Sequence, residues 1–342
     1  MQIQERGSDM KRCSRCVLPE TFPGIDFDEK GVCNYCRRSK SAGRLTETMD
    51  KYRGRFEKLL SEKNRKGGYD GIMAYSGGKD STYTMYVLKK KYGLSVLAMT
   101  MDNGFISPKS LDNCRKVVEG LGVDHIIYKP RIDLLSTLFH RGEKDDFFAS
   151  RKGLERASTI CTTCMSVVKF IALRMAIEGQ IPFIFYGWSP GQAPVEASIF
   201  RNNPAMIKRM QAAMLEPMRE IAGEEVENYF LTDRHFEMAG RFPHNISPLA
   251  FLEYDEEKIM DEISSFGWEK PDDTDPNSTN CLLNALGIKA HIRRHGFHPY
   301  AFELAGLVRN GYMKREEAVA RLEEEPSQAI IKAVSEKIEK NI

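Results

Sequence analysis

Long apolar runs are missing from this sequence. A segment of about 18 or more apolar residues, which a membrane-spanning helix needs, is not found in the chain of 342 residues. The first residues, "MQIQERGSDMKRCSRC", lack the apolar core of a secretory signal. Both absences argue against a membrane span or export, so we expect a cytoplasmic protein without membrane contact.

A strong net charge is also missing. The formal charge is +2, so no overall field calls for a polyanionic partner. A local basic surface is still allowed. The stretch 51–68 has seven Lys or Arg against two Glu, which fits either a nucleic-acid contact or the exposed face of an amphipathic helix. Neither internal repeats nor low-complexity tracts are evident, and the length is typical of about two domains.

Six of the eight cysteines occur in Cys-x-x-Cys pairs. Two pairs, Cys13 with Cys16 and Cys33 with Cys36, are separated by sixteen residues near the start of the chain. So short a segment buries little core and needs a staple. Four thiolates suit tetrahedral zinc, so the spacing predicts a zinc-ribbon-like domain over 1–45. A redox-active dithiol is the alternative, although it does not explain two matched pairs.

Apolar runs then alternate with amphipathic helical patterns. Nearly continuous apolar runs, typical of buried strands, lie at 71–76, 94–102, 124–130 and 181–189. This alternation predicts an α/β fold over 46–246, in which a parallel sheet carries helices on both faces and ligands bind at the carboxyl ends of the strands. The stretch 247–342 is predicted to form a smaller helical C-terminal region.

The stretch "YSGGKDST" follows the first predicted strand and opens a helix. Gly77 and Gly78 allow a tight turn whose N–H groups approach an anion, and the helix N-terminus adds partial positive charge. Lys79 adds a cation, while Asp80 suits a divalent cation, Mg²⁺, held beside phosphates. Hydroxyl groups able to donate to phosphate oxygens come from Ser76, Ser81 and Thr82. The glycine spacing differs from that of the Walker A loop.

The complete "SGGKDS" motif resembles the PP-loop of the N-type ATP pyrophosphatases. The resemblance implies that the loop holds the pyrophosphate of ATP. It also implies adenylation of a carbonyl or enol oxygen, so that a nitrogen or sulfur nucleophile displaces AMP. The family further places the turn with Thr100, Asp102 and Asn103 near the adenosine, and Gly187 and Ser189 near phosphate or substrate. A plain strand-end turn is an equally good interpretation of the first three residues.

A third pair, Cys161 and Cys164, opens a helical pattern, and Cys281 lies where a polar loop turns into a helix. Cysteines three apart share one face of a helical turn, and the helix N-terminus favours their thiolates. Three thiolates leave one coordination position open, which suits an exchangeable ligand. The alternatives are a second zinc site and buried cysteines of the kind expected for Cys114.

This trio of cysteines resembles the tRNA thiolation branch of the PP-loop family, the 2-thiocytidine and 2-thiouridine synthetases. In that branch three cysteines hold a 4Fe-4S cluster, and the fourth iron is free to carry a sulfide. The resemblance implies the same cluster on Cys161, Cys164 and Cys281, together with a sulfur donor as partner.

Other stretches resemble the N-acetyl sugar amidotransferases of bacterial surface-glycan pathways. They are "CSRCVLPETFPGIDFDEKGVCNYC", "YSGGKDST" and "RNGYMKREEAVARL". The resemblance implies a sugar acetamido group converted to an amidine with ammonia from a glutaminase partner. It is weaker over 145–300, where the family has a Lys-His-rich motif and this chain has "GWEKPDDTDPNSTNCLLN".

Histidines cluster in "HIRRHGFHPY", where His291 and His295 are four residues apart. This spacing fits ligands for a metal or phosphate, and Arg293 and Arg294 suit an anionic substrate. Without a partner motif, the favoured interpretation is a polar helix end with a solvent-facing His-Arg patch.

The leading hypothesis is an ATP-dependent sulfur transferase with Lys79, Asp80, Cys161, Cys164 and Cys281 in its catalytic machinery. The acceptor is either tRNA or a small molecule such as a nucleotide sugar, and a homodimer is allowed. The alternative is the sugar amidotransferase. A zinc-ribbon adaptor that only senses nucleotide is a third, non-enzymatic hypothesis, which leaves the three-cysteine site without a purpose.

Overall fold

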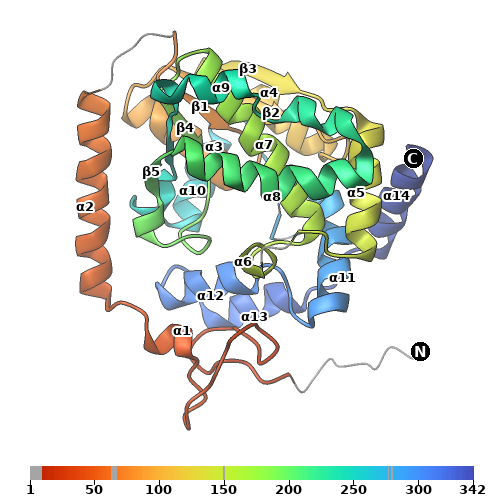
Figure 1. Ribbon diagram of the computed structural model, residues 1–342. Coiled ribbons are helices and arrows are strands. Elements are labelled where there is room, and N and C mark those ends of the chain that lie inside the picture. Colours follow the sequence, from red (N-terminus) through yellow and green to blue (C-terminus); the bar gives the residue numbers. More distant parts are fainter. Residues whose placement is uncertain (1–9, 63–67, 149–150, 276, 279) are drawn as a thin grey trace.

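The computed structural model describes residues 10–62, 68–148, 151–275, 277–278 and 280–342. Figure 1 shows a central sheet between layers of helices. The N-terminal cysteine segment lies at the bottom of that view, beneath α12 (Ala301–Arg309) and α13 (Arg315–Glu323), and α2 (Ala42–Ser61) stands along one flank.

The sheet contains six strands in the order β3-β2-β1-β4-β6-β5. All neighbours are parallel except β5 and β6, which are antiparallel. Strands β1 to β4 form at the four predicted runs, but the expectation of burial is wrong for β3, which lies at the edge of the sheet with Ile126 42% and Ile127 45% exposed. Strands β5 and β6 lie in a stretch for which no strand was predicted. The strand order reverses between β1 and β4, and such switch points are where open α/β sheets bind ligands. The bounds are β1 Gly71–Ala74, β2 Val96–Met101, β3 Asp124–Tyr128, β4 Phe183–Tyr186, β5 Ile199–Arg201 and β6 His244–Ile246.

Helices cover both faces of the sheet, as predicted. Successive strand residues point to opposite faces, and Ile72 and Met73 accordingly belong to two different hydrophobic clusters. The cluster around Met73 includes side chains of α3 (Lys79–Tyr86), α4 (Pro108–Leu121) and α10 (Glu256–Ser264). The cluster around Ile72 includes side chains of α5 (Ile132–Lys144), α7 (Thr159–Glu178) and α8 (Pro204–Ala222).

Helix α7 corrects one expectation drawn from the sequence. It is long and apolar enough to cross a membrane, so the statement that the chain has no such segment is wrong for this helix. In the fold 56% of its most apolar window is buried, and it packs against α5, α11 (Leu283–His295), β1 and β4. These contacts are those of a core helix, which passes the same test of length and composition.

The C-terminal helices pack in two groups. Helices α11 and α14 (Gln328–Lys340) contact α5, on the side of the sheet that α7 covers. Helices α12 and α13 instead meet the N-terminal cysteine segment, where the Arg315 guanidinium donates to the carbonyl oxygens of Cys16 at 3.0 Å and Cys13 at 3.2 Å. The boundaries 1–45, 46–246 and 247–342 stay predictions.

Shorter elements complete the chain. Helix α2 buries only Phe56, so the described part of the basic stretch 51–68 is mostly the exposed face of a helix; residues 63–67 lie outside the described residues. The π-helix Val87–Lys91 extends α3. The remaining short helices are α1 Asn34–Arg37, α6 Arg151–Leu154, α9 Asp233–Glu237 and the 3-10 turns Val195–Ala197, Glu224–Tyr229, Ala239–Arg241 and Pro248–Ala250.

Candidate active site

The loop after β1 is built around a glycine that no other residue can replace without strain. Gly77 has a φ of +79°, and a Cβ there would lie 2.7 Å from Cys114 Sγ and 2.8 Å from the carbonyl oxygen of Ser110. Gly78 is the N-cap of α3 and leads into the helix in an extended conformation. The turn therefore presents backbone N–H groups at a helix N-terminus, as a phosphate cradle requires.

Two loops meet beside this turn. Ser76 Oγ and Ser81 Oγ lie 3.0 Å apart, and the Ser81 hydroxyl donates to the carbonyl oxygen of Gly78 at 3.0 Å. Gly187 follows β4 and packs so closely that a Cβ would lie 2.4 Å from Ser81 Cα. Ser76, Ser81 and Gly187 all line one cavity of about 500 Å³. The fold thus brings the two serines of the "SGGKDS" motif together with Gly187, which the sequence had singled out in a separate stretch.

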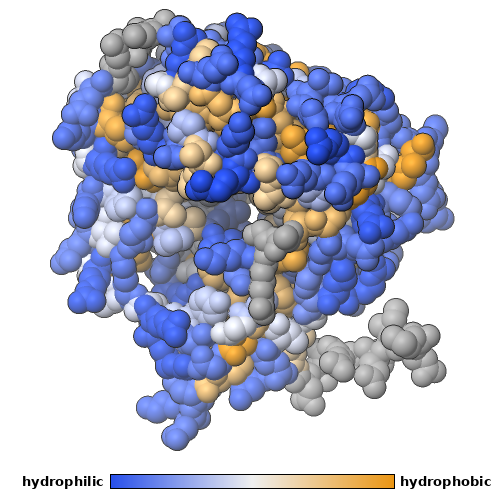
Figure 2. Space-filling view, in the orientation of Figure 1, coloured by the Kyte–Doolittle hydropathy of each residue, from blue (hydrophilic) through white to orange (hydrophobic). Residues whose placement is uncertain are grey.

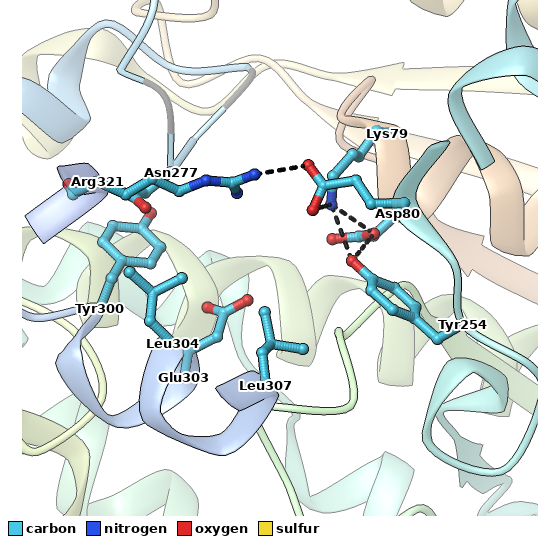
Figure 3. Close-up of a pocket in the computed structure, with 10 residues that line it drawn as sticks. Lys79, Asp80, Tyr254, Asn277, Tyr300, Glu303, Leu304, Leu307 and Arg321 are labelled. Carbon is cyan, nitrogen blue, oxygen red and sulfur yellow. Dashed lines mark hydrogen bonds and ion pairs between the residues drawn. The ribbon is translucent and has the colours of Figure 1, made fainter. Parts of the chain in front are cut away.

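Lys79 and Asp80 point into a second, smaller pocket of about 50 Å³ (Figure 3). The Lys79 ammonium donates to Asp80 Oδ1 and to the Tyr254 hydroxyl, each at 2.9 Å, and lies 3.9 Å from Glu256 Oε2. Burial alone would lower the pKa of Lys79, but the negative charges of Asp80 and Glu256, together with the hydrogen bond to the Tyr254 hydroxyl, outweigh burial and raise the pKa. Lys79 is therefore a permanent cation beside the loop.

Other residues of the small pocket were not found from the sequence. Glu303 accepts a hydrogen bond from the Ser189 hydroxyl at 2.6 Å, and burial raises the pKa of Glu303 to about 7. At the end of the pocket away from Lys79, the Arg321 guanidinium forms an ion pair with Glu256 at 3.0 Å (Figure 3). Tyr254 lies just before α10, whereas Glu256, Glu303 and Arg321 lie on helices. Only Arg321 falls in a stretch that the sequence analysis had singled out, "RNGYMKREEAVARL", and no motif marks the other three.

The three cysteines of the proposed cluster line the large cavity. Cys161 and Cys164 lie on the first two turns of α7, and the Asn103 amide donates to Cys164 Sγ at 3.4 Å and to Cys281 Sγ at 3.6 Å. Cys161 Sγ lies 3.6 Å from Asn284 Oδ1. One side chain from the turn after β2 thus links thiols that are far apart in sequence.

Main-chain pairing fixes Cys281 at the cavity. Cys281 forms a β-bridge with Ile106, the Leu282 N–H donates to the carbonyl oxygen of Phe105 at 2.9 Å, and the Ser107 N–H donates to that of Asn280 at 3.0 Å. These main-chain hydrogen bonds to the loop after β2 therefore fix the position of the loop that carries Cys281.

Burial raises the pKa of all three thiols, to about 11 for Cys161, and the Cys281 charge raises the pKa of Cys161 and Cys164 further. A bound cation would reverse this preference, because metal ligands bind as thiolates. Among the described residues, the three ligand atoms of this trio do not all lie within 4.8 Å of one another. Thiolates on one zinc ion are at most about 4.6 Å apart, so the trio fits a multi-atom cluster better than a second zinc ion.

The four N-terminal cysteines do meet the condition for a single ion. Their sulfur atoms all lie within 4.8 Å of one another, and all four side chains are buried. Cys13 Sγ and Cys36 Sγ are 3.8 Å apart, Cys16 Sγ and Cys33 Sγ are 3.7 Å apart, and the Cys33 N–H donates to Cys13 Sγ at 3.2 Å. This is a metal-binding group whose donor set and spacing suit tetrahedral zinc.

Thr82, Thr100 and Asp102, whose side chains were predicted to lie near the nucleotide, line neither cavity. The Thr82 hydroxyl lies 3.2 Å from the Tyr75 hydroxyl, and the Thr100 hydroxyl donates to the carbonyl oxygen of Tyr75 at 2.8 Å. Asp102 accepts from the Gly104 N–H at 2.9 Å and pairs with Lys129 at 3.2 Å. These contacts support the loops, and a role toward ATP stays a prediction for all three.

The solvent-facing interpretation of the histidine patch is wrong for His291, which is 0% exposed. Burial lowers the pKa of His291 to about 3, so the ring is neutral. Arg294 donates to the carbonyl oxygens of Gly142 and Glu143, and Arg293 donates to that of Glu143 as well. The arginines therefore cap the C-terminal end of α5.

The cavity face of α7 continues beyond the cysteines to Lys169, which the sequence reasoning missed. The Lys169 ammonium contacts Met210 Sδ at 3.1 Å, and burial lowers the pKa of Lys169 to about 8. Lys169 follows Cys161 by eight residues, a spacing that returns to nearly the same side of a helix, and this was the available signal.

No protein-family model matches the chain. An uncharacterized protein of Methanocaldococcus jannaschii is 25% identical over 322 residues, which cover 91% of this chain and 93% of that protein. The NH(3)-dependent NAD(+) synthetase of the same organism is 31% identical over 83 residues, or 24% of this chain and 32% of that enzyme. The match to this synthetase is thus confined to a short part of both chains.

Two solved structures are similar to the chain more loosely. The U34-tRNA thiolase NcsA from Methanococcus maripaludis, solved with its [4Fe-4S] cluster, has 18% identity and a TM-score of 0.38, over 89% of this chain and 87% of that chain. NMN synthetase from Francisella tularensis has 11% identity and a TM-score of 0.39, over 88% of this chain and 97% of that chain. At these TM-scores neither structure decides how the site is used.

The Gly77→Ala substitution is expected to abolish ATP binding and to destabilise the protein by about 1–3 kcal/mol, because the new Cβ clashes with Cys114 and Ser110. Gly122→Ala is the matched control, because Gly122 has a φ of +62° but nothing lies within 4 Å of the position that its Cβ would take. The Gly122→Ala variant should lose only about 1 kcal/mol of its free energy of unfolding and retain ATP binding. Urea unfolding and calorimetric ATP titration measure both effects, and equal losses in the two variants would contradict the clash.

The Lys169→Met substitution is expected to stabilise the protein at pH 7, on the order of 1–3 kcal/mol, because the buried ammonium is costly. The pKa falls from 10.5 to about 8 on folding, so the unfolded state binds more protons between these values. The advantage of the variant should therefore be complete below pH 8 and shrink as the pH rises toward 10.5. Urea unfolding at several pH values checks this, with the exposed Lys116→Met as control; an advantage that does not change with pH would refute it.

Proposed function

We propose that the protein is an ATP-dependent sulfur transferase that adenylates a substrate oxygen and replaces it with sulfur. One observation carries the proposal: Ser76 and Ser81 of the phosphate loop and the thiols of Cys161, Cys164 and Cys281 line the same cavity of about 500 Å³. Activation of an oxygen and delivery of a nucleophile must occur within reach of one substrate, and this cavity offers both.

The phosphate loop would bind and orient ATP. Backbone N–H groups at the start of α3, with the Ser76 and Ser81 hydroxyls, would hold the phosphate oxygens. Lys79 stays cationic and would stabilise the charge that develops on the leaving pyrophosphate. Asp80, next to Lys79, would help to orient Mg²⁺. The acceptor oxygen would attack the α-phosphorus, so that an oxygen–phosphorus bond forms as pyrophosphate leaves.

The three thiols would hold the 4Fe-4S cluster, which when bound supplies the sulfide nucleophile. Asn103 would orient two of them, because its amide donates to the sulfur atoms of both Cys164 and Cys281. In the second half of the reaction a carbon–sulfur bond forms and the carbon–oxygen bond to AMP breaks. A sulfur donor would restore the nucleophile, and the acceptor would be a tRNA base or a small molecule.

The sugar amidotransferase is the alternative within the same chemistry of activation. Ammonia from a glutaminase partner would then replace sulfide, and the three thiols would have no ligand role. The two functions therefore differ in the metal content that they require.

Protein purified without oxygen is expected to contain about four irons and four acid-labile sulfides per chain, since three thiolates hold such a cluster. It should also contain about one zinc on the N-terminal cysteines. Cys281→Ala should lose the iron and sulfide and retain the zinc. Elemental analysis and a sulfide assay measure all three contents.

Cys114→Ala is the matched control for this experiment, because Cys114 is buried and lines neither cavity. It should retain iron, sulfide and zinc. Zinc alone, unchanged by Cys281→Ala, would reject the sulfur-transfer function and favour the amidotransferase. Hydrolysis of ATP to AMP and pyrophosphate in the presence of an acceptor would exclude a nucleotide-sensing adaptor.

A further inference from the structure

The large cavity has an apolar half that the phosphate loop and the thiols do not use. Its walls come from Phe200 of β5, Met210 and Met214 of α8, and Trp188 after β4. Trp188 is 39% exposed although it lines the cavity, so it lies toward the opening. Figure 2 shows this face of the molecule hollowed between α8 and the helices beneath it. The cavity is therefore open enough for a substrate of some length.

Lys169 is the one cation among the described residues that line this cavity. Its ammonium contacts the thioether of Met210, and no carboxylate of the described ranges forms an ion pair with it. Lys79, at the neighbouring pocket, is instead surrounded by Asp80, Tyr254 and Glu256. The charge of Lys169 thus lies in the apolar half of the cavity, and no carboxylate of the described residues compensates it as Asp80 and Glu256 compensate Lys79.

A buried ammonium without a paired carboxylate lowers the free energy of unfolding and adds no stabilising contact that an apolar side chain would not make. Burial lowers the pKa of Lys169, and desolvation is the one cause of that shift. A methionine would fill the same space at no such cost. Groups that are held at a cost are expected where function needs them.

We propose that the acceptor is a small amphiphilic organic anion whose carboxylate or phosphate pairs with Lys169. Its apolar body would lie along Met210, Met214 and Trp188, and its reacting oxygen would lie at the other end, between the phosphate loop and the thiols. This assignment rests on the proposed function for the identity of the reacting end, while the anion subsite itself rests on Lys169 and the apolar walls.

The spacing along α7 sets the length of this acceptor. Lys169 follows Cys164 by five residues and Cys161 by eight, which corresponds to about 8–12 Å along the helix axis. The anionic group and the reacting carbon are therefore separated by a distance of this order. Such a spacer suits an elongated metabolite better than a compact one.

A nucleic acid fits the apolar half poorly. Binding of a phosphate backbone depends on several cations along a track, and this half of the cavity offers one lysine among apolar side chains. The formal charge of +2 adds no compensating field. A free small anion needs one cation and an apolar wall, and both are present.

Tryptophan fluorescence tests the subsite without ATP or turnover. The chain has two tryptophans, and Trp268 is 2% exposed and donates a hydrogen bond to the carbonyl oxygen of Gly77. A ligand in the cavity should therefore change mainly the emission of Trp188. 4-Phenylbutyrate and phenyl phosphate are the anionic probes, and 4-phenylbutanamide is the neutral one. We expect at least one anion to bind about tenfold more tightly than the amide.

Lys169→Met should remove this preference for the anion, Lys169→Arg should retain it, and Lys116→Met should bind as the unchanged protein does. Circular dichroism confirms that each variant is folded. Equal binding of the anions and the amide, or anion binding unchanged in Lys169→Met, would overturn the subsite. A short oligouridylate that binds more tightly than both anions and depends on Lys169 would replace the small anion with a nucleic acid.

The test also separates the subsite from the sulfur-transfer function. Cys281→Ala should bind the anionic probe as the unchanged protein does, because Lys169 and the apolar walls do not depend on a cluster. If iron is absent but binding still depends on Lys169, the sulfur transferase fails and the anion subsite stands. If iron is present but binding does not depend on Lys169, the subsite fails and the proposed function stands.

Discussion

The site depends on the close approach of two backbones at the point where the strand order reverses. Gly187, after β4, packs directly against the first turn of α3, and Gly77 turns the chain beneath Cys114 and Ser110. Because neither glycine has a side chain, the loops after β1 and β4 form one continuous wall. The hydroxyls of Ser76 and Ser81 are held on this wall within hydrogen-bonding distance of each other. Every other functional group is arranged around it.

The three thiols are positioned near that wall by segments that are distant in the sequence. The turn after β2 provides Asn103, and the same turn pairs through its main chain with the segment that carries Cys281. Cys161 and Cys164 come from another segment, the first two turns of α7, which packs against the sheet. Parallel strands end at one edge of a sheet, so three segments distant in sequence converge there without any long-range motif.

The sequence was most informative where local chemistry dictates conformation. The glycines of the phosphate loop, the matched cysteine pairs and the buried strands β1, β2 and β4 all follow from short patterns. The burial of β3 was predicted wrongly, because an apolar run does not show whether its strand lies at the edge of the sheet. It was least informative for partners contributed by tertiary packing, such as Tyr254, Glu256 and Glu303 around Lys79, because no local pattern marks a residue of one helix as the neighbour of another. The short strands β5 and β6 were missed for a related reason: three residues are too few to show alternation. His291 was misplaced at the surface because burial of its helix face depends on the N-terminal segment packed near it.

Helix α12 connects two centres that look independent in the sequence. Tyr300, its N-cap, lines both pockets, and Glu303 lies on its first turn. At its other end Arg309 lies 3.8 Å from the sulfur of Cys16, one of the four N-terminal cysteines. A helix of nine residues is a short, stiff rod. Any change in the position of those cysteines would therefore displace α12, and with it the side chain of Tyr300, which lines both pockets.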